Sequence, residues 1–332
     1  MTDLGAKLLW ELQQGLPLVS DPFRVVGEKL GISAAEVLKH IEHFFESGKA
    51  RRLGGVFDAR RLGYRSVLCA VDLPEDVIEK IATAVCSHPG VTHGYERGGV
   101  GGHRWPNFWF TLATPQAEFD RELAVIRHHV EPYALLTLPA LRRFKIDVKF
   151  DPRTRDRDER VPSPPSSVGL GTEPSTESFT PLDRAVVRAL ENNLPLIEHP
   201  FAKIAEELGM AESDLLARLD SWMKQGVLRR MALIVLHRKI GFTANGMCVW
   251  DVPKNEVLEV GRRVAEAPEV SHCYERPRSE FFPFTLYAMI HTGNPESTRK
   301  LFERISRDAG LQSGQLLLSL REFKKTSMNY FA

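Results

Sequence analysis

The pattern of hydrophobic and polar positions divides the chain into short helices and strands. In residues 4–14 and 23–30 the apolar side chains recur at the spacing of an amphipathic helix. The same pattern returns in residues 182–192 and 201–208, so each half of the chain is expected to open with two helices.

A third helix is expected after each of these pairs. Ser33 can cap it, because Glu36 stands three residues later as in a capping box, and Ser213 is the matching candidate in the second half. Gly48 and Gly226 would end the two helices. Helices joined by a tight, glycine-containing turn predict a helix-turn-helix head in each half. The wing strands of these heads are expected at residues 51–57 and 229–236.

The rest of each half alternates between segments typical of strands and of helices. Their order, βαββαβ, indicates a ferredoxin-like α+β sandwich. In the first half these segments are residues 65–73, 75–87, 91–97, 105–114, 116–129 and 135–150. In the second half they are residues 243–252, 255–267, 270–276, 282–292, 295–308 and 315–330.

The two halves are copies of one unit. FRVVGEKLG at residues 23–31 matches FAKIAEELG at 201–209, with an offset of 201 − 23 = 178. VTHGYER at 91–97 matches VSHCYER at 270–276, with an offset of 270 − 91 = 179, so one residue was inserted between these points. The chain is therefore predicted to be an α+β tandem repeat, each unit a winged helix-turn-helix head followed by a ferredoxin-like βαββαβ sandwich.

The repeat also sets the domain boundaries. The segment between the units begins with mixed charges and ends in a Pro/Ser/Gly-rich run, which is typical of an exposed linker. The expected domains are the first head (1–60), the first sandwich (61–150), the linker (151–180), the second head (181–238) and the second sandwich (239–332).

The bulk composition excludes several classes of protein. Lys plus Arg is 44 and Asp plus Glu is 43, a balance that argues against a general polyanion binder. The 4 cysteines form no CxxC pair, so no zinc or iron–sulfur framework is visible, and a reduced, cytoplasmic setting is expected. The N-terminal stretch carries Asp3, Lys7 and Glu11 among its apolar residues and is not expected to be a signal peptide, and no uncharged run is long enough to span a membrane.

Two matching strands carry an unusual row of polar side chains. Alternate residues of a strand share a face, so His93, Tyr95 and Arg97 are expected to point together. The second copy repeats the row with His272, Tyr274 and Arg276. Such groups are costly to bury unless they are hydrogen-bonded or face a polar ligand. The row therefore lines a substrate site, or its Tyr-Glu-Arg segment forms an ion pair between the sheets.

Head plus sandwich resembles the Lrp/AsnC family, and within it the chain is similar to the siroheme decarboxylases of heme d1 and alternative heme biosynthesis. The resemblance covers nearly the whole chain except the linker. It rests on the doubled V-[ST]-H-x-Y-E-R strand, on GGVFDARRLGY at 54–64 and on FTLYAMIHT at 284–292. It implies loss of carbon dioxide from the acetate groups at C12 and C18 of siroheme, giving 12,18-didecarboxysiroheme. No cofactor beyond the iron of the siroheme is implied.

The implied substrate gives the candidate residues their chemical roles. Its carboxylates need cationic, preferably bidentate partners, and its flat macrocycle needs apolar walls. The cationic candidates are Arg51, Arg52, Arg97, Arg104, Arg229, Arg230 and Arg276, although the outward member of each Arg-Arg pair fits an ordinary surface charge better. The wall candidates are Trp105, Phe108, Trp109, Phe282, Phe284 and Tyr287, most of which would also suit a core.

The loss of carbon dioxide leaves electron density on a carbon atom that must then be protonated. A histidine can deliver that proton near neutral pH, or it can ligate the siroheme iron. Tyr95 and Tyr274 could orient a carboxylate or relay a proton. The sequence does not divide the two histidine roles among His93, His272, His103 and His291. His103 follows a glycine-rich hairpin, and His291 aligns with Thr114 (291 − 177 = 114), so the units differ at both positions.

The alternative reading is a DNA-binding regulator of the Lrp/AsnC type, with or without heme sensing. Glu36 and Asp214 lie at the leading ends of the two recognition helices, where an acid opposes phosphate, so no DNA binding is expected. The expected partner is siroheme or a related iron-porphyrin, and no membrane is expected. Sandwiches of this type usually pair. The tandem can satisfy that pairing as an internal pseudo-dimer, and a homodimer of the chain stays open.

Overall fold

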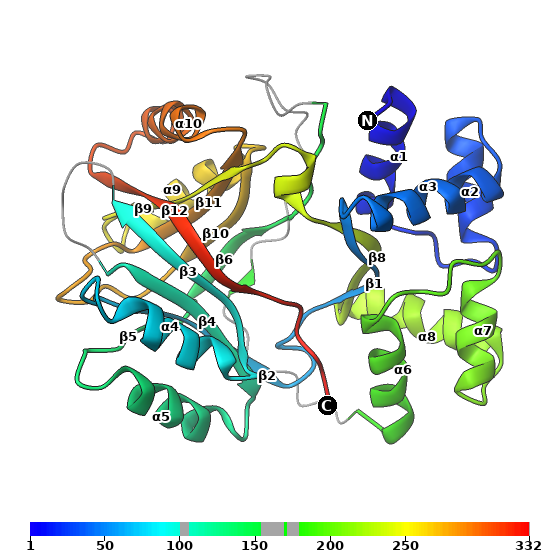
Figure 1. The fold of residues 1–332 in the computed structure, drawn as a ribbon, viewed down its shortest axis with the longest axis horizontal. Coiled ribbons are helices and arrows are strands. Elements are labelled where there is room, and N and C mark those ends of the chain that lie inside the picture. Colours follow the sequence, from blue (N-terminus) through cyan, green and yellow to red (C-terminus); the bar gives the residue numbers. More distant parts are fainter. Residues whose placement is uncertain (100–105, 154–168, 171–178, 332) are drawn as a thin grey trace.

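A computed structural model describes residues 1–99, 106–153, 169–170 and 179–331 of the chain. The two heads lie on one side of the molecule and the two sandwiches on the other, with strands β1 and β8 between them (Figure 1). The order of the elements confirms the predicted α+β tandem of head and sandwich. None of the helices in the described ranges is long and apolar enough to cross a membrane.

Each head consists of three helices followed by a strand. In the first head these are α1 (Asp3–Gln14), α2 (Pro22–Leu30), α3 (Ala34–Glu46) and β1 (Ala50–Phe57). In the second head they are α6 (Pro181–Glu191), α7 (Pro200–Glu207), α8 (Glu212–Gln225) and β8 (Leu228–Val235). Ser33 caps α3 through the predicted capping box with Glu36. The predicted cap at Ser213 is wrong, because α8 follows Ala211 and Ser213 already lies in its first turn.

Strands β1 and β8 pair with each other across the two heads. The pairing is antiparallel and places Gly54 opposite Ala232. The predicted wing strands therefore exist, but each finds its partner in the other head. Packing explains this arrangement, because the apolar side chains of both heads form one continuous core. At Gly54 a Cβ would lie 2.3 Å from the carbonyl oxygen of Asn192, so glycine is needed where the end of α6 approaches β1.

The other described strands form one sheet in the order β5-β2-β4-β3-β12-β9-β11-β10-β6-β7. The first sandwich contains β2 (Tyr64–Val71), α4 (Ile78–Ser87), β3 (Val91–Gly99), β4 (Phe108–Pro115) and α5 (Phe119–Val130). After the short helix η1 (His237–Ile240), the second contains β9 (Ala244–Trp250), α9 (Val257–Glu266), β10 (Val270–Glu275), β11 (Leu286–Thr292) and α10 (Pro295–Asp308). A core lies beneath each pair of helices, and a further apolar cluster contains residues of both sandwiches.

The last strand of each unit leaves its own sandwich and enters the other one. The single strand predicted at 135–150 is split into β5 (Leu136–Leu138), which pairs with β2, and β6 (Arg142–Ile146), which pairs with β10 of the second unit. Likewise, β12 (Gly314–Lys325) pairs first with β9 and then with β3 of the first unit. The last strand of each predicted βαββαβ unit therefore completes the sheet of the other unit. The short strand β7 (Gly169–Leu170) pairs with β6.

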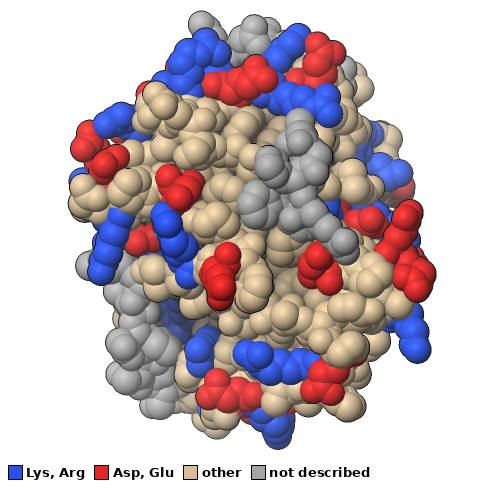
Figure 2. Space-filling view, turned by 90° about the vertical axis from the view of Figure 1, so that its left-hand side faces the viewer, with Lys and Arg blue, Asp and Glu red and all other residues tan. Residues whose placement is uncertain are grey.

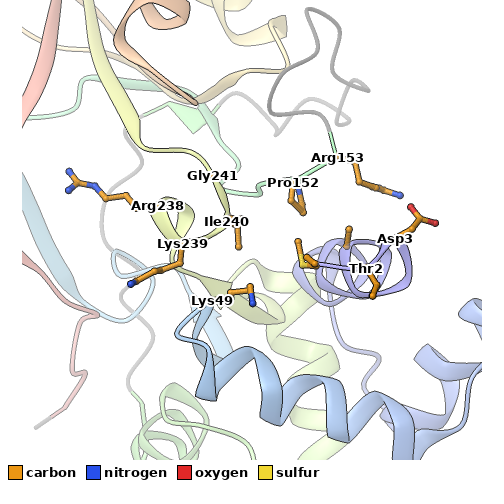
Figure 3. A pocket seen from close by; sticks show the side chains of 11 residues that line it. Thr2, Asp3, Lys49, Pro152, Arg153, Arg238, Lys239, Ile240 and Gly241 are labelled. Carbon is orange, nitrogen blue, oxygen red and sulfur yellow. The ribbon is translucent and has the colours of Figure 1, made fainter.

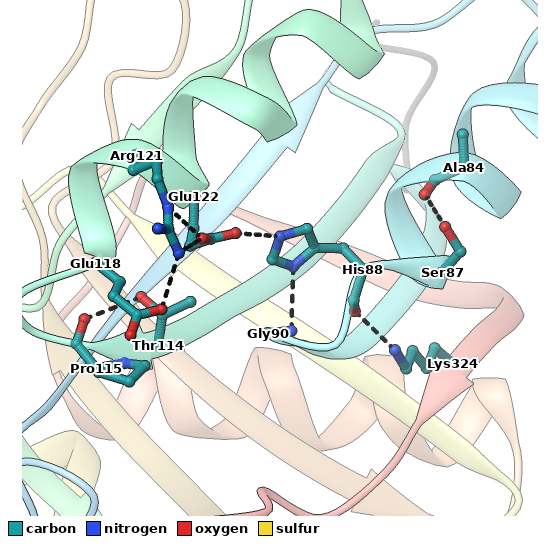
Figure 4. A network of polar contacts seen from close by, with 10 residues as sticks. All are labelled: Ala84, Ser87, His88, Gly90, Thr114, Pro115, Glu118, Arg121, Glu122 and Lys324. Carbon is teal, nitrogen blue, oxygen red and sulfur yellow. Dashed lines mark hydrogen bonds and ion pairs between the residues drawn. The ribbon is translucent and has the colours of Figure 1, made fainter. Parts of the chain in front are cut away.

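Two matching lysines fasten the exchanged strands. Lys324 Nζ donates to the carbonyl oxygen of His88 at 2.9 Å, and Lys145 Nζ donates to that of Ala267 at 2.8 Å. The ring of His88 also contacts the carboxylate of Glu122 on α5 at 2.8 Å (Figure 4). Because the same contact occurs once in each direction, the two units form a pseudo-symmetric pair within one chain.

Candidate active site

Two polar faces carry the residues singled out by the repeated motif. The first face consists of His93, Tyr95 and Arg97 on β3, and the second face consists of His272, Tyr274 and Arg276 on β10. In the first face the rings of His93 and Tyr95 are 6.4 Å apart, and the Arg97 guanidinium lies 5.1 Å from the tyrosine ring. The second face repeats this geometry with 6.2 Å and 5.1 Å. The predicted alignment of these side chains is confirmed.

The glutamates of the same motif make a different contact. Glu96 pairs with Arg321 at 3.1 Å, and Glu275 pairs with Arg142 at 3.2 Å. Each of these arginines belongs to the exchanged strand of the other unit. The interpretation of the motif as an interface ion pair therefore holds for its glutamates, while the histidine, tyrosine and arginine share the other face of the strand.

Arg97 and Arg276 are each held by a backbone carbonyl of the other unit, on β12 for Arg97 and on β5 for Arg276. Nη1 of Arg97 lies 3.4 Å from the carbonyl oxygen of Leu317 and 3.3 Å from Oδ1 of Asn245. Nη1 of Arg276 donates to the carbonyl oxygen of Leu138. Burial lowers the pKa of Arg97 to about 10, which leaves its guanidinium protonated at neutral pH.

Most of the aromatic candidates occupy core positions. Trp109, Phe282, Phe284 and Tyr287 belong to the apolar cluster shared by the two sandwiches, and Phe108 belongs to the core beneath α4 and α5. The Arg276 guanidinium lies 5.5 Å from the ring of Tyr287. The buried hydroxyl of Tyr287 has no hydrogen-bond partner in the described part of the chain, which keeps it a candidate for contact with a ligand.

The two motif histidines are neutral at neutral pH. Burial lowers the pKa of His93 to about 3, with further contributions from the charges of Lys325 and Arg51. Burial and Arg229 likewise lower the pKa of His272 to about 4. A neutral imidazole can ligate iron directly, but it must first gain a proton before it can donate one.

His291 connects to the second face through a serine. Its Nε2 lies 3.2 Å from Ser271 Oγ, which lies 3.0 Å from Nδ1 of His272. The strand register corrects the alignment inferred from the sequence. Val270 pairs with Ile290 and Val91 pairs with Leu112, so His291 corresponds to Ala113 and not to Thr114. The first unit still has no histidine at this position.

Three of the four arginines on β1 and β8 have partners within the chain. Arg52 donates to the carbonyl oxygen of Glu191, and Arg230 donates to that of Val148 at 3.1 Å, so these two arginines tie the strands of the heads to neighbouring segments and neither is an ordinary surface charge. Arg229 Nη2 lies 2.6 Å from Oδ2 of Asp58.

Asp58 is a residue that the sequence analysis did not single out. Its Oδ2 also accepts from Arg143 at 3.0 Å. Burial alone would raise the pKa of Asp58, but Arg229 and Arg143 together bring it down to about 2. The carboxylate is therefore ionised at neutral pH and serves as the counter-ion of Arg229.

Arg51 is buried among groups that do not satisfy it. Its Nε and Nη1 have no hydrogen-bond partner in the described residues. Its surroundings include Lys325, whose Nζ lies 2.9 Å from Nδ1 of His237. Burial lowers the pKa of Lys325 to about 8 and that of His237 to about 3. The sequence analysis also missed these two residues. Aligning the repeats position by position would have revealed them, because Lys325 replaces Ile146 and His237 replaces Ala59 of the other unit.

His103, Arg104 and Trp105, which were also candidates, lie outside the described residues. Across the ranges that are described, no group of three or more His, Cys, Asp or Glu side chains could hold a metal ion.

An open cleft of about 710 Å³ lies between η1 and the N-terminal end of α1 (Figure 3). The charged residues that line it are Asp3, Lys49, Arg153, Arg238 and Lys239. Helix η1 connects the cleft to the first face, because Arg238 lies 3.9 Å from Glu322 on β12 and His237 contacts Lys325. By contrast, the end of the sandwiches away from the heads shows cations and anions interspersed (Figure 2). The cleft is therefore a locally cationic region of a nearly neutral chain.

Comparison with known families agrees with this division of the chain. Residues 61–145 and 239–324 match the AsnC-like ligand binding domain. Residues 6–51 and 183–229 match the siroheme decarboxylase NirDL-like HTH domain.

Relatives of similar length carry the same combination. The chain is 38% identical to a siroheme decarboxylase of Hydrogenobacter thermophilus, over 98% of this chain and 94% of the relative. It is 31% identical to the siroheme decarboxylase NirDL subunit of Paracoccus pantotrophus, over 88% and 85%. The crystal structure of a siroheme decarboxylase NirDL superposes with a TM-score of 0.73 at 34% identity, covering 99% of this chain and 95% of the other. The structure of a siroheme decarboxylase NirDL with an iron-uroporphyrin III analogue superposes with a TM-score of 0.72 at 33% identity, with the same coverage.

Proposed function

This chain belongs to the siroheme decarboxylase family, and from that premise we propose that it releases the acetate carboxyl groups at C12 and C18 of siroheme as carbon dioxide. The product would be 12,18-didecarboxysiroheme. The observation that carries the proposal is the buried guanidinium of Arg51, whose Nε and Nη1 have no acceptor in the described part of the chain. A carboxylate of the tetrapyrrole supplies the missing acceptor, and buried cations are stable mainly when such a partner is present.

The reaction sets simple requirements for the protein. Each acetate loses carbon dioxide and keeps the bonding electron pair on its methylene carbon, and that carbon takes up one proton to become a methyl group. We propose that His93, His272 and His291 divide between them the delivery of this proton and the ligation of the iron carried by the substrate. The carboxylates of the bound substrate would raise the depressed pKa values of His93 and His272 and allow them to take up a proton from solvent.

The proposal includes no cofactor beyond the iron of the substrate. Siroheme or a related iron-porphyrin is the proposed partner, with neither DNA nor a membrane. The exchange of strands supports pairing within the chain, so a second copy is not needed to complete the sheet. The four buried free cysteines support a reducing, cytoplasmic setting.

Anaerobic incubation of the purified chain with siroheme, followed by mass analysis of the tetrapyrrole, tests the proposal. We expect two successive losses of one carbon dioxide each. Unchanged siroheme after complete binding would reject the enzymatic function. A salt-dependent, sequence-selective complex with duplex DNA would instead support a regulator of the Lrp/AsnC type.

A further inference from the structure

The first and second faces differ in their polar and charged groups at three positions that the repeat makes equivalent. The offsets are 236 − 58 = 178, 237 − 59 = 178 and 325 − 146 = 179. At these positions the second face has Asp58, Ala59 and Ile146. The first face has Leu236, His237 and Lys325 in their places. The strand pairing confirms the last of them, because Ile146 lies opposite His272 and Lys325 lies opposite His93.

The second face is neutralised by the protein itself. Arg229 is the repeat counterpart of Arg51, since 229 − 51 = 178. Its guanidinium contacts the Asp58 carboxylate at 2.6 Å, and Arg143 contacts the same oxygen at 3.0 Å. A side-chain carboxylate therefore already occupies the place where an anionic ligand would bind these cations.

The first face lacks the counter-ion that Asp58 provides in the second face. Leu236 stands where the second face has Asp58, and this leaves Nε and Nη1 of Arg51 without a partner in the described ranges. Lys325 donates from Nζ to Nδ1 of His237, so the proton of that ring lies on Nε2, a second buried donor without an acceptor there. Glu322 lies nearby, and its negative charge raises the pKa of Arg51, but its carboxylate is paired with Arg238 at 3.9 Å.

We infer that the first face binds a carboxylate of the tetrapyrrole between Arg51 and Lys325, while Asp58 already fills the corresponding anion position of the second face. This inference rests on the proposed function and adds which of the two faces takes the anion. It also indicates which carboxylate is bound. Decarboxylation removes negative charge from the reacting carboxylate, so a cation on that group would stabilise the ground state and slow the reaction. Arg51 and Lys325 therefore hold a carboxylate that the reaction retains, such as a propionate.

Anaerobic absorption titrations of the full chain with two ligands test this inference. Iron-uroporphyrin III carries acetates and propionates, and iron-coproporphyrin III carries propionates with methyl groups in place of the acetates. Lys325→Met keeps the length of the side chain and removes its charge. We expect this variant to bind both ligands roughly 10- to 100-fold more weakly, which is the usual effect of losing one charge-assisted hydrogen bond. Lys325→Arg should restore binding.

The matched control lies at the repeat-equivalent position of the second face. Ile146→Met should leave both affinities unchanged, because no carboxylate of the ligand is bound at that position. With siroheme as the substrate, Lys325→Met should raise KM and leave kcat within a few-fold of its original value. Arg51→Met provides an independent variant with the same expected pattern if the Lys325 variant does not fold.

Three outcomes would overturn the inference. In the first, Lys325→Met loses affinity for iron-uroporphyrin III alone, which would place the reacting acetate on Lys325. In the second, Ile146→Met loses as much affinity as Lys325→Met. In the third, Lys325→Met binds both ligands with unchanged affinity. A wild-type chain that binds both ligands as expected but releases no carbon dioxide from siroheme would refute the proposed function and leave the carboxylate-binding face intact.

Discussion

Asp58 of the first unit accepts a hydrogen bond from Arg229 of the second unit at 2.6 Å, and this contact joins the segment after β1 to β8. Together with Arg143, this contact lowers the pKa of Asp58 from 3.8 to about 2. A carboxyl whose pKa is depressed by folding adds stability above its unfolded pKa and loses that contribution as the pH falls through its folded pKa.

We therefore expect Asp58→Asn to lower the free energy of unfolding by about 2 kcal/mol at neutral pH, the energy equivalent of this pKa shift. The difference between wild type and variant should shrink as the pH falls from 3.8 toward 2. Urea unfolding at a series of pH values measures it. A difference that is constant down to low pH would show that Asp58 acts through its shape and not through its charge.

The pH dependence of ligand binding follows from Lys325. Burial lowers its pKa to about 8, and a bound carboxylate favours the ammonium form. Affinity for iron-uroporphyrin III should therefore be full below this pH and fall as the pH rises through about 8. Lys325→Arg should flatten the profile, because a guanidinium stays protonated over this range. Titrations across the range give the Kd values, and a flat wild-type profile would contradict the assignment.

The helices and strands could be predicted from the sequence, but the pairing of the strands within the sheet could not. Periodicity and capping located the helices, and the doubled motif located β3 and β10. The alternation within a strand does not state which neighbour it joins, so the exchange of β6 and β12 between the units was not predictable from either segment alone. The break between β5 and β6 follows Pro139, which has no N–H for a sheet ladder.

The candidate site could be predicted where its residues follow one another along a single strand, but not where they come from other elements. His93, Tyr95 and Arg97 follow from alternation along one strand. Lys325 was missed because it reaches the first face only through the exchanged strand, and His237 was missed because it lies on η1. Their signal was a difference between repeats, which is visible only when the two units are compared position by position.

The cationic cleft beside η1 should affect how fast a polyanionic ligand arrives. Lys49 and Lys239 line the cleft and are not among the residues of either face. Changing both to Gln should slow association with iron-uroporphyrin III at low ionic strength and have little effect at high salt, because steering by exposed charges is screened. Stopped-flow mixing at several salt concentrations measures the rate. A matched double change at Lys254 and Lys300, which are not among the residues that line the cleft, should leave it unaltered. An equal slowing in both double variants would assign the effect to net charge alone.

The histidines can be separated by spectrum and turnover. His93→Ala and His272→Ala should fold, because each imidazole is a member of a polar face and not of an apolar core. Loss of a proton donor lowers the rate by roughly 10²- to 10⁴-fold and leaves the visible spectrum of bound siroheme unchanged. Loss of an iron ligand changes that spectrum directly.

His291→Ala and His103→Ala complete the set, since neither residue has a histidine counterpart in the other unit. We expect at least one of the four variants to bind siroheme and fail to decarboxylate it. If all four kept full activity, the histidine-centred mechanism would be wrong, and the tyrosines and arginines of the two faces would have to carry the reaction.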